Sequence, residues 1–264
     1  MSIFDRHEMV ANRRNFIGLL AAIPATVMAK PPSVVRLKVG DRLPRFDLIR
    51  PGKRSYLISS LHDGRHIAQN VWQRQVEFQR RSGKLELCIR QHWDGVGETP
   101  AFVERESWFE MGTFRPSTHT RITTRQGKRT VEGFLFGERG ITGLLDLKDN
   151  VHVDFSVHSE EPMFNFETDM EMLQALPWAE GYAVSIPLFH PASNSQPARY
   201  LWSVLGNEAL VGPAGWIDCW VVGCDYNSAD PPTRFWLSKN TQQVIKMESP
   251  PVNDVVRRKT LLWT

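Results

Sequence analysis

The residues best placed to do chemistry are two histidines and an aspartate within the run 152–158. In a β-strand, His152, Asp154, Ser156 and His158 fall on one face, because successive side chains alternate. Imidazole and carboxylate groups on one face could bind a transition metal or act as acid and base. The polar, solvated face of a half-buried strand shows the same alternation. The pattern leaves both interpretations open.

No other catalytic or cofactor motif stands out in the sequence. It contains no Gly-x-Ser-x-Gly nucleophile elbow, and the glycines between 137 and 143 lack the strand-to-helix context of a phosphate-binding loop. We therefore expect no cofactor, no resident metal and no identifiable catalytic residue. A triad assembled in space from distant residues would leave no such motif, so a hydrolase stays among the alternatives.

Three cysteines are available for redox chemistry or packing. Cys219 and Cys224 lie five residues apart in a predicted strand, so they should point to opposite faces. Cys88 could form a disulfide with either of them outside the cytoplasm. The spacing fits no zinc pattern. The other interpretation is that all three are buried free thiols acting as small apolar side chains.

The N-terminal segment predicts export. Arg13, Arg14 and Phe16 lie in a run that resembles the bacterial twin-arginine export motif. The apolar run 16–28 is shorter than the roughly 20 residues of a membrane span, and Ala29 ends it as a signal peptidase site would. We expect a cleaved signal peptide over 1–29, the twin-arginine translocase as a partner during export, and a periplasmic location. The alternative is an uncleaved anchor or an amphipathic segment.

Composition and charge narrow the class of protein. Hydrophobic residues make up 41% and charged residues 23% of 264, which is typical of a folded globular chain. The net charge of +3 is nearly balanced, whereas phosphate binding along a nucleic acid needs a concentrated basic face. We expect no nucleic-acid partner.

The spacing of apolar residues predicts a mainly β fold. Residues 30–53 contain four prolines and several charges, which indicates an extended leader. Residues 54–264 form a single β-rich domain of short alternating runs separated by turn signals. Strands are expected at 56–59, 66–79, 85–93, 101–110, 119–125, 129–136, 143–147, 151–157, 182–187, 199–211, 216–226, 234–238, 242–248 and 255–262.

One helix is expected to interrupt the strands. Thr168 and Glu171 have the spacing of a capping box, with Thr168 as the N-cap. Met170, Leu173 and Leu176 then recur near helical spacing until Pro177 ends the run. These residues could form the core face of a short helix or the wall of an apolar pocket.

Three tryptophans suggest a binding surface opposite this helix. Trp202, Trp220 and Trp236 lie on three successive predicted strands, and we expect them to stack on one face. The strand 216–222 is apolar on both faces, which predicts a central strand covered on both sides. The predicted ligand-binding residues are Phe166, Met170, Leu173, Trp202, Trp220 and Trp236.

Runs 215–222, 234–239 and 244–248 carry a family resemblance. They combine a glycine turn with a Cys-aromatic strand, an aromatic strand ending in Lys, and a strand ending in Lys-x-Glu. Over residues 164–248 the chain resembles a broad bacterial family of exported β-sheet proteins of uncharacterised function. The resemblance implies an open antiparallel half-barrel, a curved sheet wrapped around one short helix. It is similar to the periplasmic carriers that sort lipoproteins and hold acyl chains in an apolar concavity.

Three functions are consistent with these features. The first is a non-enzymatic periplasmic binding protein that holds an apolar or amphipathic ligand, such as a lipid or acyl chain. The second is a structural or interaction module of the cell envelope that docks a protein partner. The third is a metal-dependent or hydrolytic enzyme.

Overall fold

The computed structural model describes residues 33–96, 100–191, 196–225 and 231–263. The export-signal residues Arg13, Arg14, Phe16 and Ala29 lie outside the described residues. In chain order the elements are β1 (Val34–Arg36), η1 (Phe46–Leu48), β2 (Gly52–His62), β3 (Arg65–Arg81), β4 (Lys84–Gly95), β5 (Ala101–Glu110), β6 (Pro116–Arg125), β7 (Lys128–Gly137), β8 (Gly140–Gly143), β9 (Ser156–His158), β10 (Phe164–Asn165), η2 (Phe166–Thr168), α1 (Asp169–Gln174), β11 (Ala183–Phe189), β12 (Ala198–Gly212), β13 (Gly215–Cys224), β14 (Thr233–Ser238), β15 (Val244–Glu248) and β16 (Val256–Trp263).

All strands of the described residues belong to one sheet. Its order is β1-β11-β12-β13-β14-β15-β16-β2-β3-β4-β5-β6-β7-β8-β9, and β10 pairs with β11 off this path. Neighbouring strands are antiparallel except where β1 and β10 run parallel to β11. The two ends of the order, β1 and β9, do not pair with each other, so the sheet is open. The predicted mainly β fold, an open half-barrel around one short helix, is confirmed.

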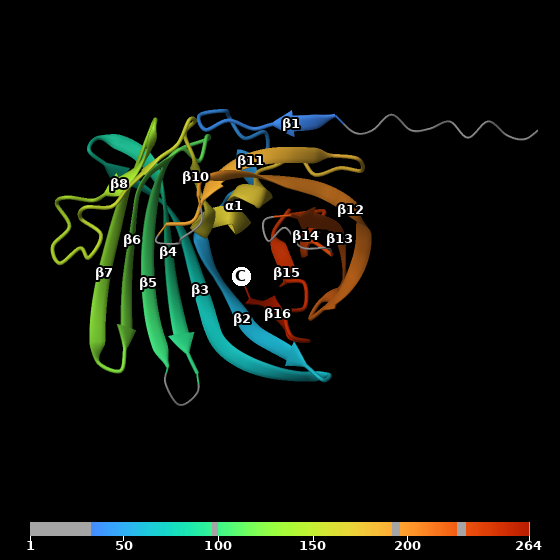
Figure 1. The fold of residues 1–264 in the computed structure, drawn as a ribbon. Helices are drawn as coiled ribbons and strands as arrows, with labels where there is room; N and C mark the ends of the chain where they lie inside the picture. The colour runs from blue at the N-terminus through green and yellow to red at the C-terminus, as the bar shows by residue number, and fades with distance from the viewer. Residues whose placement is uncertain (1–32, 97–99, 192–195, 226–230, 264) are drawn as a thin grey trace, which may run out of the picture. The chain divides into compact units, whose positions relative to one another are not determined.

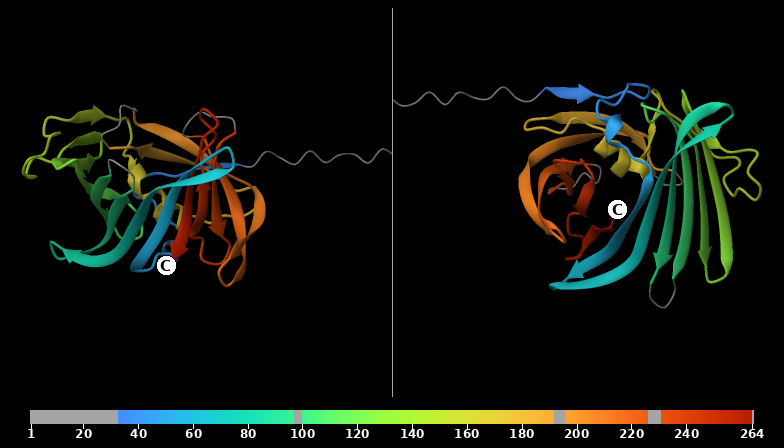
Figure 2. Two further views of the ribbon diagram at one scale, coloured as in Figure 1. Left: turned by 90° about the horizontal axis from the view of Figure 1, so that it is seen from below. Right: turned by 180° about the vertical axis from the view of Figure 1, so that it is seen from behind.

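The sheet curves around α1. Figure 1 shows the helix on the inner side of the strands from β11 round to β3, and Figure 2 shows the same curve from below and from behind. We call the face that packs on α1 the inner face and the opposite one the outer face. Cross-strand register carries the inner face through Phe235, Met247, Lys259 and Ile58, because directly opposed residues share a face.

The main hydrophobic core lies between the inner face and α1. Met170, Leu173 and Leu176 are all buried in it, together with Trp202 and Tyr56. The segment expected to be an extended leader also contributes, because Leu37, Leu43 and Ile49 belong to this core. A second, smaller cluster forms around Phe134, Ile141, Met163 and Phe189.

The hairpin between β6 and β7 has a two-residue turn. Arg125 pairs with Lys128, and the two loop residues, Gln126 and Gly127, both have positive φ (49° and 75°). Two consecutive left-handed residues match the right-handed twist of the flanking strands, and glycine adopts that conformation without strain. The turn fixes the register of the strands that position the site described below.

Two predicted strands are wrong. Residues 144–147 and 151–154 form turns, and the strands nearby are β8 and β9. The cause is Asn150, whose side chain accepts from the backbone N–H groups of Gly133 and His152 at 3.0 Å and donates to the carbonyls of Gly133 and Leu144. An asparagine that bonds the backbone in this way replaces the ladder with a loop.

The predicted capping box is also wrong, although the helix starts where expected. Thr168 is the residue before α1, but its hydroxyl donates to the carbonyl of Asn165 at 3.0 Å instead of capping the helix. Glu171 does not reach back to Thr168, because Arg74 binds its carboxylate. Tertiary pairing therefore overrides the local motif.

None of the helices in the described part of the chain has the length and apolar character needed to cross a membrane.

Candidate functional site

The segment from η2 to α1 presents its two sides to different parts of the inner face. Glu167 and Glu171 are buried carboxylates on one side, while Met170 and Leu173 enter the apolar core on the other. Asp169 is also buried, and burial raises the pKa of its carboxyl. Three acidic side chains within five residues require cationic partners, because an isolated buried charge is costly.

Three arginines that pair with Glu167 and Glu171 belong to a polar row across the inner face of β2–β6. The register places its members directly opposite one another in the order Arg54, Arg74, Gln91, Arg105 and Arg121. Each arginine occupies a position that alternation would normally give to an apolar residue, as in β3, where Trp72 and Val76 flank Arg74 on the same face. Like charges opposite one another destabilise a sheet, so the row depends on compensating acids.

We call the arginine row and the acids that face it the charged layer. Arg74 and Glu171 form its most buried ion pair. The Nε of Arg74 donates to Oε1 of Glu171 at 2.7 Å, and its Nη2 donates to Oε2. The same Nη2 donates to the carbonyl of Glu167 at 3.2 Å. The guanidinium also lies over the Trp72 ring, 4.3 Å from its centroid. This bidentate ion pair holds α1 against β3.

Glu167 is shared between two arginines. Arg105 reaches its Oε2 at 3.1 Å and Arg121 reaches its Oε1 at 2.8 Å. Burial alone would raise the pKa of Glu167, but Arg105, His190 and Arg121 outweigh burial and hold the pKa well below its usual range. Burial likewise lowers the pKa of Arg105 to about 10, despite the attraction of Glu167. Glu167 is therefore ionised at neutral pH.

The charged layer continues to two half-exposed histidines. Arg121 also contacts Glu132 at 3.5 Å, and Oε1 of Glu132 lies 3.0 Å from Nε2 of His152. On the other side, His190 Nε2 lies 3.2 Å from Glu167. The network thus links a buried carboxylate to imidazoles at the surface.

A serine and a histidine meet next to this layer. Ser107 Oγ and His119 Nδ1 are 2.8 Å apart, and Asn165 donates to the same hydroxyl at 3.3 Å. Both side chains are completely buried, and burial lowers the pKa of His119 to about 3. A histidine with so low a pKa is a poor general base at neutral pH. The pair therefore acts as a packed polar contact.

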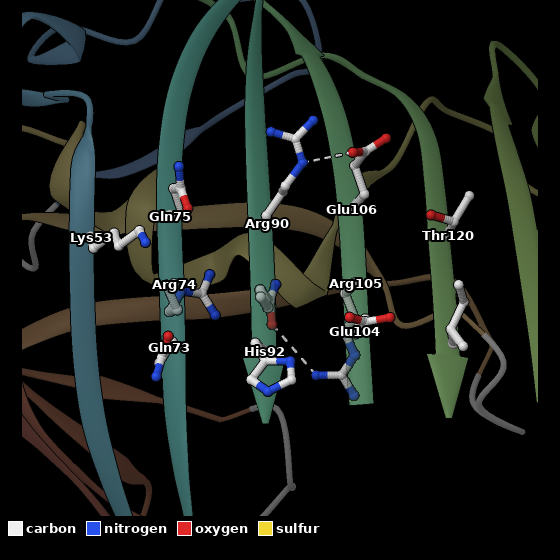
Figure 3. Close-up of a pocket in the computed structure, with 12 residues that line it drawn as sticks. Lys53, Gln73, Arg74, Gln75, Arg90, His92, Glu104, Arg105, Glu106 and Thr120 are labelled. Carbon is white, nitrogen blue, oxygen red and sulfur yellow. Dashed lines mark hydrogen bonds and ion pairs between the residues drawn. The ribbon is translucent and has the colours of Figure 1, made fainter. Parts of the chain in front are cut away.

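A groove of about 410 Å³ lies over the outer face of the same strands (Figure 3). Two cross-strand rows line it, namely Lys53, Gln75, Arg90, Glu106 and Thr120 in one, and Gln73, His92, Glu104 and Ile122 in the other. Arg90 pairs with Glu106 at 2.8 Å and also with Glu77. Arg74, Gln91 and Arg105 border the groove from the inner-face row.

The six predicted ligand-binding residues do not line this groove. Met170, Leu173 and Trp202 are packed in the main core, and Phe166 packs beside His190 with ring centroids 5.3 Å apart. Trp220 is half-buried on the inner face, where Lys239 lies 4.5 Å from its ring centroid.

The expectation that the three tryptophans stack on one face is wrong. Trp202 opposes Cys224, which shares the inner face with Trp220, whereas Trp236 opposes Val221 and so lies on the outer face. There its indole donates to Glu208 at 2.7 Å, and Lys246 lies 3.7 Å from its ring centroid. β13 lies between β12 and β14 as predicted, but Trp216 at its start is exposed, so it is not covered along its whole length.

The histidine-aspartate pattern at 152–158 does not form one strand face, because residues 151–154 form a turn. His152 pairs with Glu132 instead, and His158 is exposed on β9. No group of three or more His, Cys, Asp or Glu side chains within the described ranges is arranged to hold a metal ion. Cys88, Cys219 and Cys224 are buried free thiols, and burial raises the pKa of Cys88 to about 12 and of Cys219 to about 11.

One family model matches most of the chain. The family model described as "Protein of unknown function (DUF3108)" matches residues 55–256. The chain belongs to this family. The matched range runs from β2 to the start of β16. Except for Lys53 and Arg54, which precede residue 55, the residues of the inner-face row and of the groove lie within the DUF3108 region.

Two solved structures resemble this DUF3108 chain. A beta-barrel-like protein of the domain of unknown function DUF1849 from Brucella abortus is 10% identical, with a TM-score of 0.44 over 79% of this chain and 95% of that one. A DUF1329 family protein from Desulfovibrio piger is 9% identical, with a TM-score of 0.33 over 83% and 87%. No curated protein matches the sequence.

The arginine row is the feature of this DUF3108 member that the sequence analysis missed. The signal for it is alternation. In β3, Arg74 has the same parity as Trp72, Val76 and Phe78, so a charged residue occupies an inward position. An inward charge in a strand indicates either a partner or a ligand on the same face.

Proposed function

We propose that the chain is a non-enzymatic periplasmic binding protein that holds an amphipathic ligand, such as a lipid or acyl chain, in the outer groove of β2–β6. The groove carries this proposal. Its volume of about 410 Å³ falls within the range of small-molecule sites.

The lining of the groove favours an amphipathic ligand over a purely apolar one. Ile122 and the methylene stems of Lys53 and Arg90 supply apolar contact, because long charged side chains lay their stems along apolar surface. The amides of Gln73 and Gln75 and the carboxylate of Glu104 supply hydrogen bonds. The proposal therefore places the ligand outside the core, away from Met170 and Leu173.

A matched pair of substitutions on β6 tests the groove. Thr120 and Thr124 both lie on the outer face, but only Thr120 lines the groove. Strands accept aromatic residues, so both Trp variants should keep stability within about 0.5 kcal/mol. A fluorescent fatty acid should bind the wild type at about micromolar concentration. Thr120→Trp should weaken this binding at least tenfold and Thr124→Trp should not.

Native mass spectrometry of protein purified from the periplasm should also detect a bound lipid or acyl chain. The groove proposal fails if the wild type binds no fatty acid, or if Thr120→Trp and Thr124→Trp bind it equally.

Export is the second part of the proposal. Arg13 and Arg14 resemble the twin-arginine motif, and lysine does not reproduce the planar guanidinium fork. Arg13→Lys with Arg14→Lys should keep the protein in the cytoplasm, as measured by fractionation. A doubly substituted protein that still reaches the periplasm with normal processing would overturn this assignment.

An envelope interaction module is the second candidate function, and one observation favours it. Val211 and Trp216 oppose each other at the tip of the β12–β13 hairpin and are 76% and 75% exposed. Exposed apolar pairs of this kind often mark a contact surface. A photo-crosslinking residue at 216 should capture a defined partner in cells, whereas one at the equally exposed Leu145 should not.

A further inference from the structure

Arg54 is a buried cation whose side chain has no partner among the described residues. Its side chain lies on the inner face of β2, and the residue is only 9% exposed. Its Nη1 is buried and donates no hydrogen bond, and the Arg54 side chain forms no hydrogen bond or ion pair with any described residue. Arginine does not lose its proton in proteins, and burying an uncompensated charge is costly. An anion at this position would remove that cost.

Arg74 supplies a second unsatisfied guanidinium edge beside it. The register places Arg74 directly opposite Arg54, so the two side chains are neighbours on the inner face. Arg74 is fully buried and binds Glu171 through Nε and Nη2, which leaves its Nη1 buried without a partner. Two guanidinium groups on adjacent strands thus each retain a free donor in a site shielded from water.

The charge of the whole layer is not balanced by the described acids. Its cations are Arg54, Arg74, Arg105, Arg121 and Lys259, and its carboxylates are Glu132, Glu167, Asp169 and Glu171. Five cations thus face four carboxylates. Of these acids, Glu171 neutralises Arg74, and Glu167 and Glu132 pair with Arg105 and Arg121 at the other end of the row. The strongest charge interaction of Asp169 is with Lys259. The surplus positive charge therefore lies at the Arg54 end.

We propose that Arg54 and Arg74 bind a phosphate group, either as inorganic phosphate or as the phosphate ester of an amphipathic molecule. The guanidinium fork matches the spacing of phosphate oxygens and is the preferred protein group for this ligand. The aromatic side chains of Tyr56 and Trp72, two residues along the same two strands and on the same face, give the site an apolar border. Arg54 lies on the opposite face of the sheet from the outer groove and does not line it, whereas Arg74 borders the groove from the inner-face row.

The first experiment measures the thermal midpoint of the full chain against inorganic phosphate at constant ionic strength. A ligand that binds only the folded state raises the midpoint by mass action. The wild type should show a saturable rise, and Arg54→Met should weaken the apparent phosphate affinity at least tenfold. The control is Arg129→Met, which removes the same charge from an exposed position on β7 and should respond like the wild type.

Arg54→Lys keeps the charge but lacks the planar guanidinium group. It shows whether weak phosphate binding by Arg54→Met comes from a fold defect. It should bind phosphate more weakly than the wild type and more tightly than Arg54→Met. The groove variant Thr120→Trp should keep the full phosphate response, which separates failure of this site from failure of the groove.

A second series distinguishes the two sources of the phosphate group. Decyl phosphate is compared with inorganic phosphate and with decyl maltoside, all below micelle-forming concentrations. Decyl phosphate that binds at least tenfold tighter than inorganic phosphate, with the same dependence on Arg54, identifies a lipid-like ester; equal affinities identify the free ion. The proposal is overturned if phosphate does not raise the midpoint of the wild type, or if Arg54→Met and Arg129→Met respond alike. Either result would mean that Arg54 does not hold a phosphate group in the folded chain.

Discussion

Two layers of the inner face hold the same short helical segment in opposite ways. Against β3–β6, Glu167 and Glu171 meet a row of arginines. Against β12–β14, Leu173 and its neighbours meet Trp202, Phe235 and Leu237 in a continuous apolar core. Buried ion pairs contribute little net stability, whereas apolar burial contributes most of it. We infer that the apolar layer stabilises the fold and that the charged layer fixes where the helix docks.

Removing one member of the most buried ion pair should have the largest effect. Glu171→Gln leaves Arg74 charged in a site with no exposure, so the free energy of unfolding should fall by about 3–5 kcal/mol. The double variant Arg74→Met with Glu171→Leu should recover most of this loss, because it removes the buried charge itself. Denaturant unfolding of all three proteins measures both values. A double variant as unstable as the single one would mean that the pair contributes net stability, contrary to the contrast drawn between the layers.

The apolar layer is tested by two tryptophans on neighbouring strands. Trp202 is completely buried beside Phe235, at a ring-centroid distance of 5.0 Å, whereas Trp220 is half-buried. Trp202→Ala should reduce the free energy of unfolding by about 3–5 kcal/mol, and Trp220→Ala by about half of that or less. Chemical denaturation of both variants checks this order. Equal losses would show that Trp220 is as well packed as Trp202.

The sequence predicts the apolar layer far better than the charged one. Helical spacing places Met170, Leu173 and Leu176 on one face, and strand alternation finds most of the β elements, because both periodicities are local. The partners of Glu171 and Glu167 come from β3, β5 and β6, between 46 and 97 residues away in the sequence. No local pattern specifies such pairings, so the local spacing predicts a capping box at Glu171 that does not form.

The face of a side chain is predictable only when the register is known. Trp202 and Trp236 both lie in strands next to other aromatic residues. The register between β13 and β14 nevertheless places Trp236 on the outer face. A shift of one residue in register exchanges the two faces of a strand. The outer groove likewise follows from how five strands lie side by side, and no single strand carries a sign of it.

A substitution in the helix tests whether the apolar layer is packed or hollow. Leu173 is fully buried in the main core, so Leu173→Trp should overpack it and lower the free energy of unfolding by about 1–3 kcal/mol. Fatty-acid binding in the outer groove should be unaffected in the folded variant. Unchanged stability together with loss of fatty-acid binding would instead place the ligand between the helix and the sheet.

The smallest predicted effect distinguishes the layers by their response to pH. His119 lies at the border of the charged layer, where burial lowers its pKa to about 3 from an ordinary value near 6.5. Below pH 6.5 the unfolded chain therefore binds a proton at His119 that the folded chain does not bind. Stability is complete above that pH and is lost as the pH falls, by about 1.4 kcal/mol per pH unit.

The pH range from 6.5 to 5 isolates this contribution. The low pKa of Glu167 gives stability that is present above the ordinary carboxyl pKa and is lost only in more acidic solution. The raised pKa of Asp169 acts in the opposite direction, so the informative quantity is the difference between two proteins. His119→Asn, which can still accept from Ser107, should show a shallower decline in unfolding free energy than the wild type. His66→Asn, at an exposed position, should keep the wild-type slope. If His119→Asn and the wild type declined in parallel, the charged layer would already admit water or a proton at His119, and the two layers would differ less in solvent access than their packing indicates.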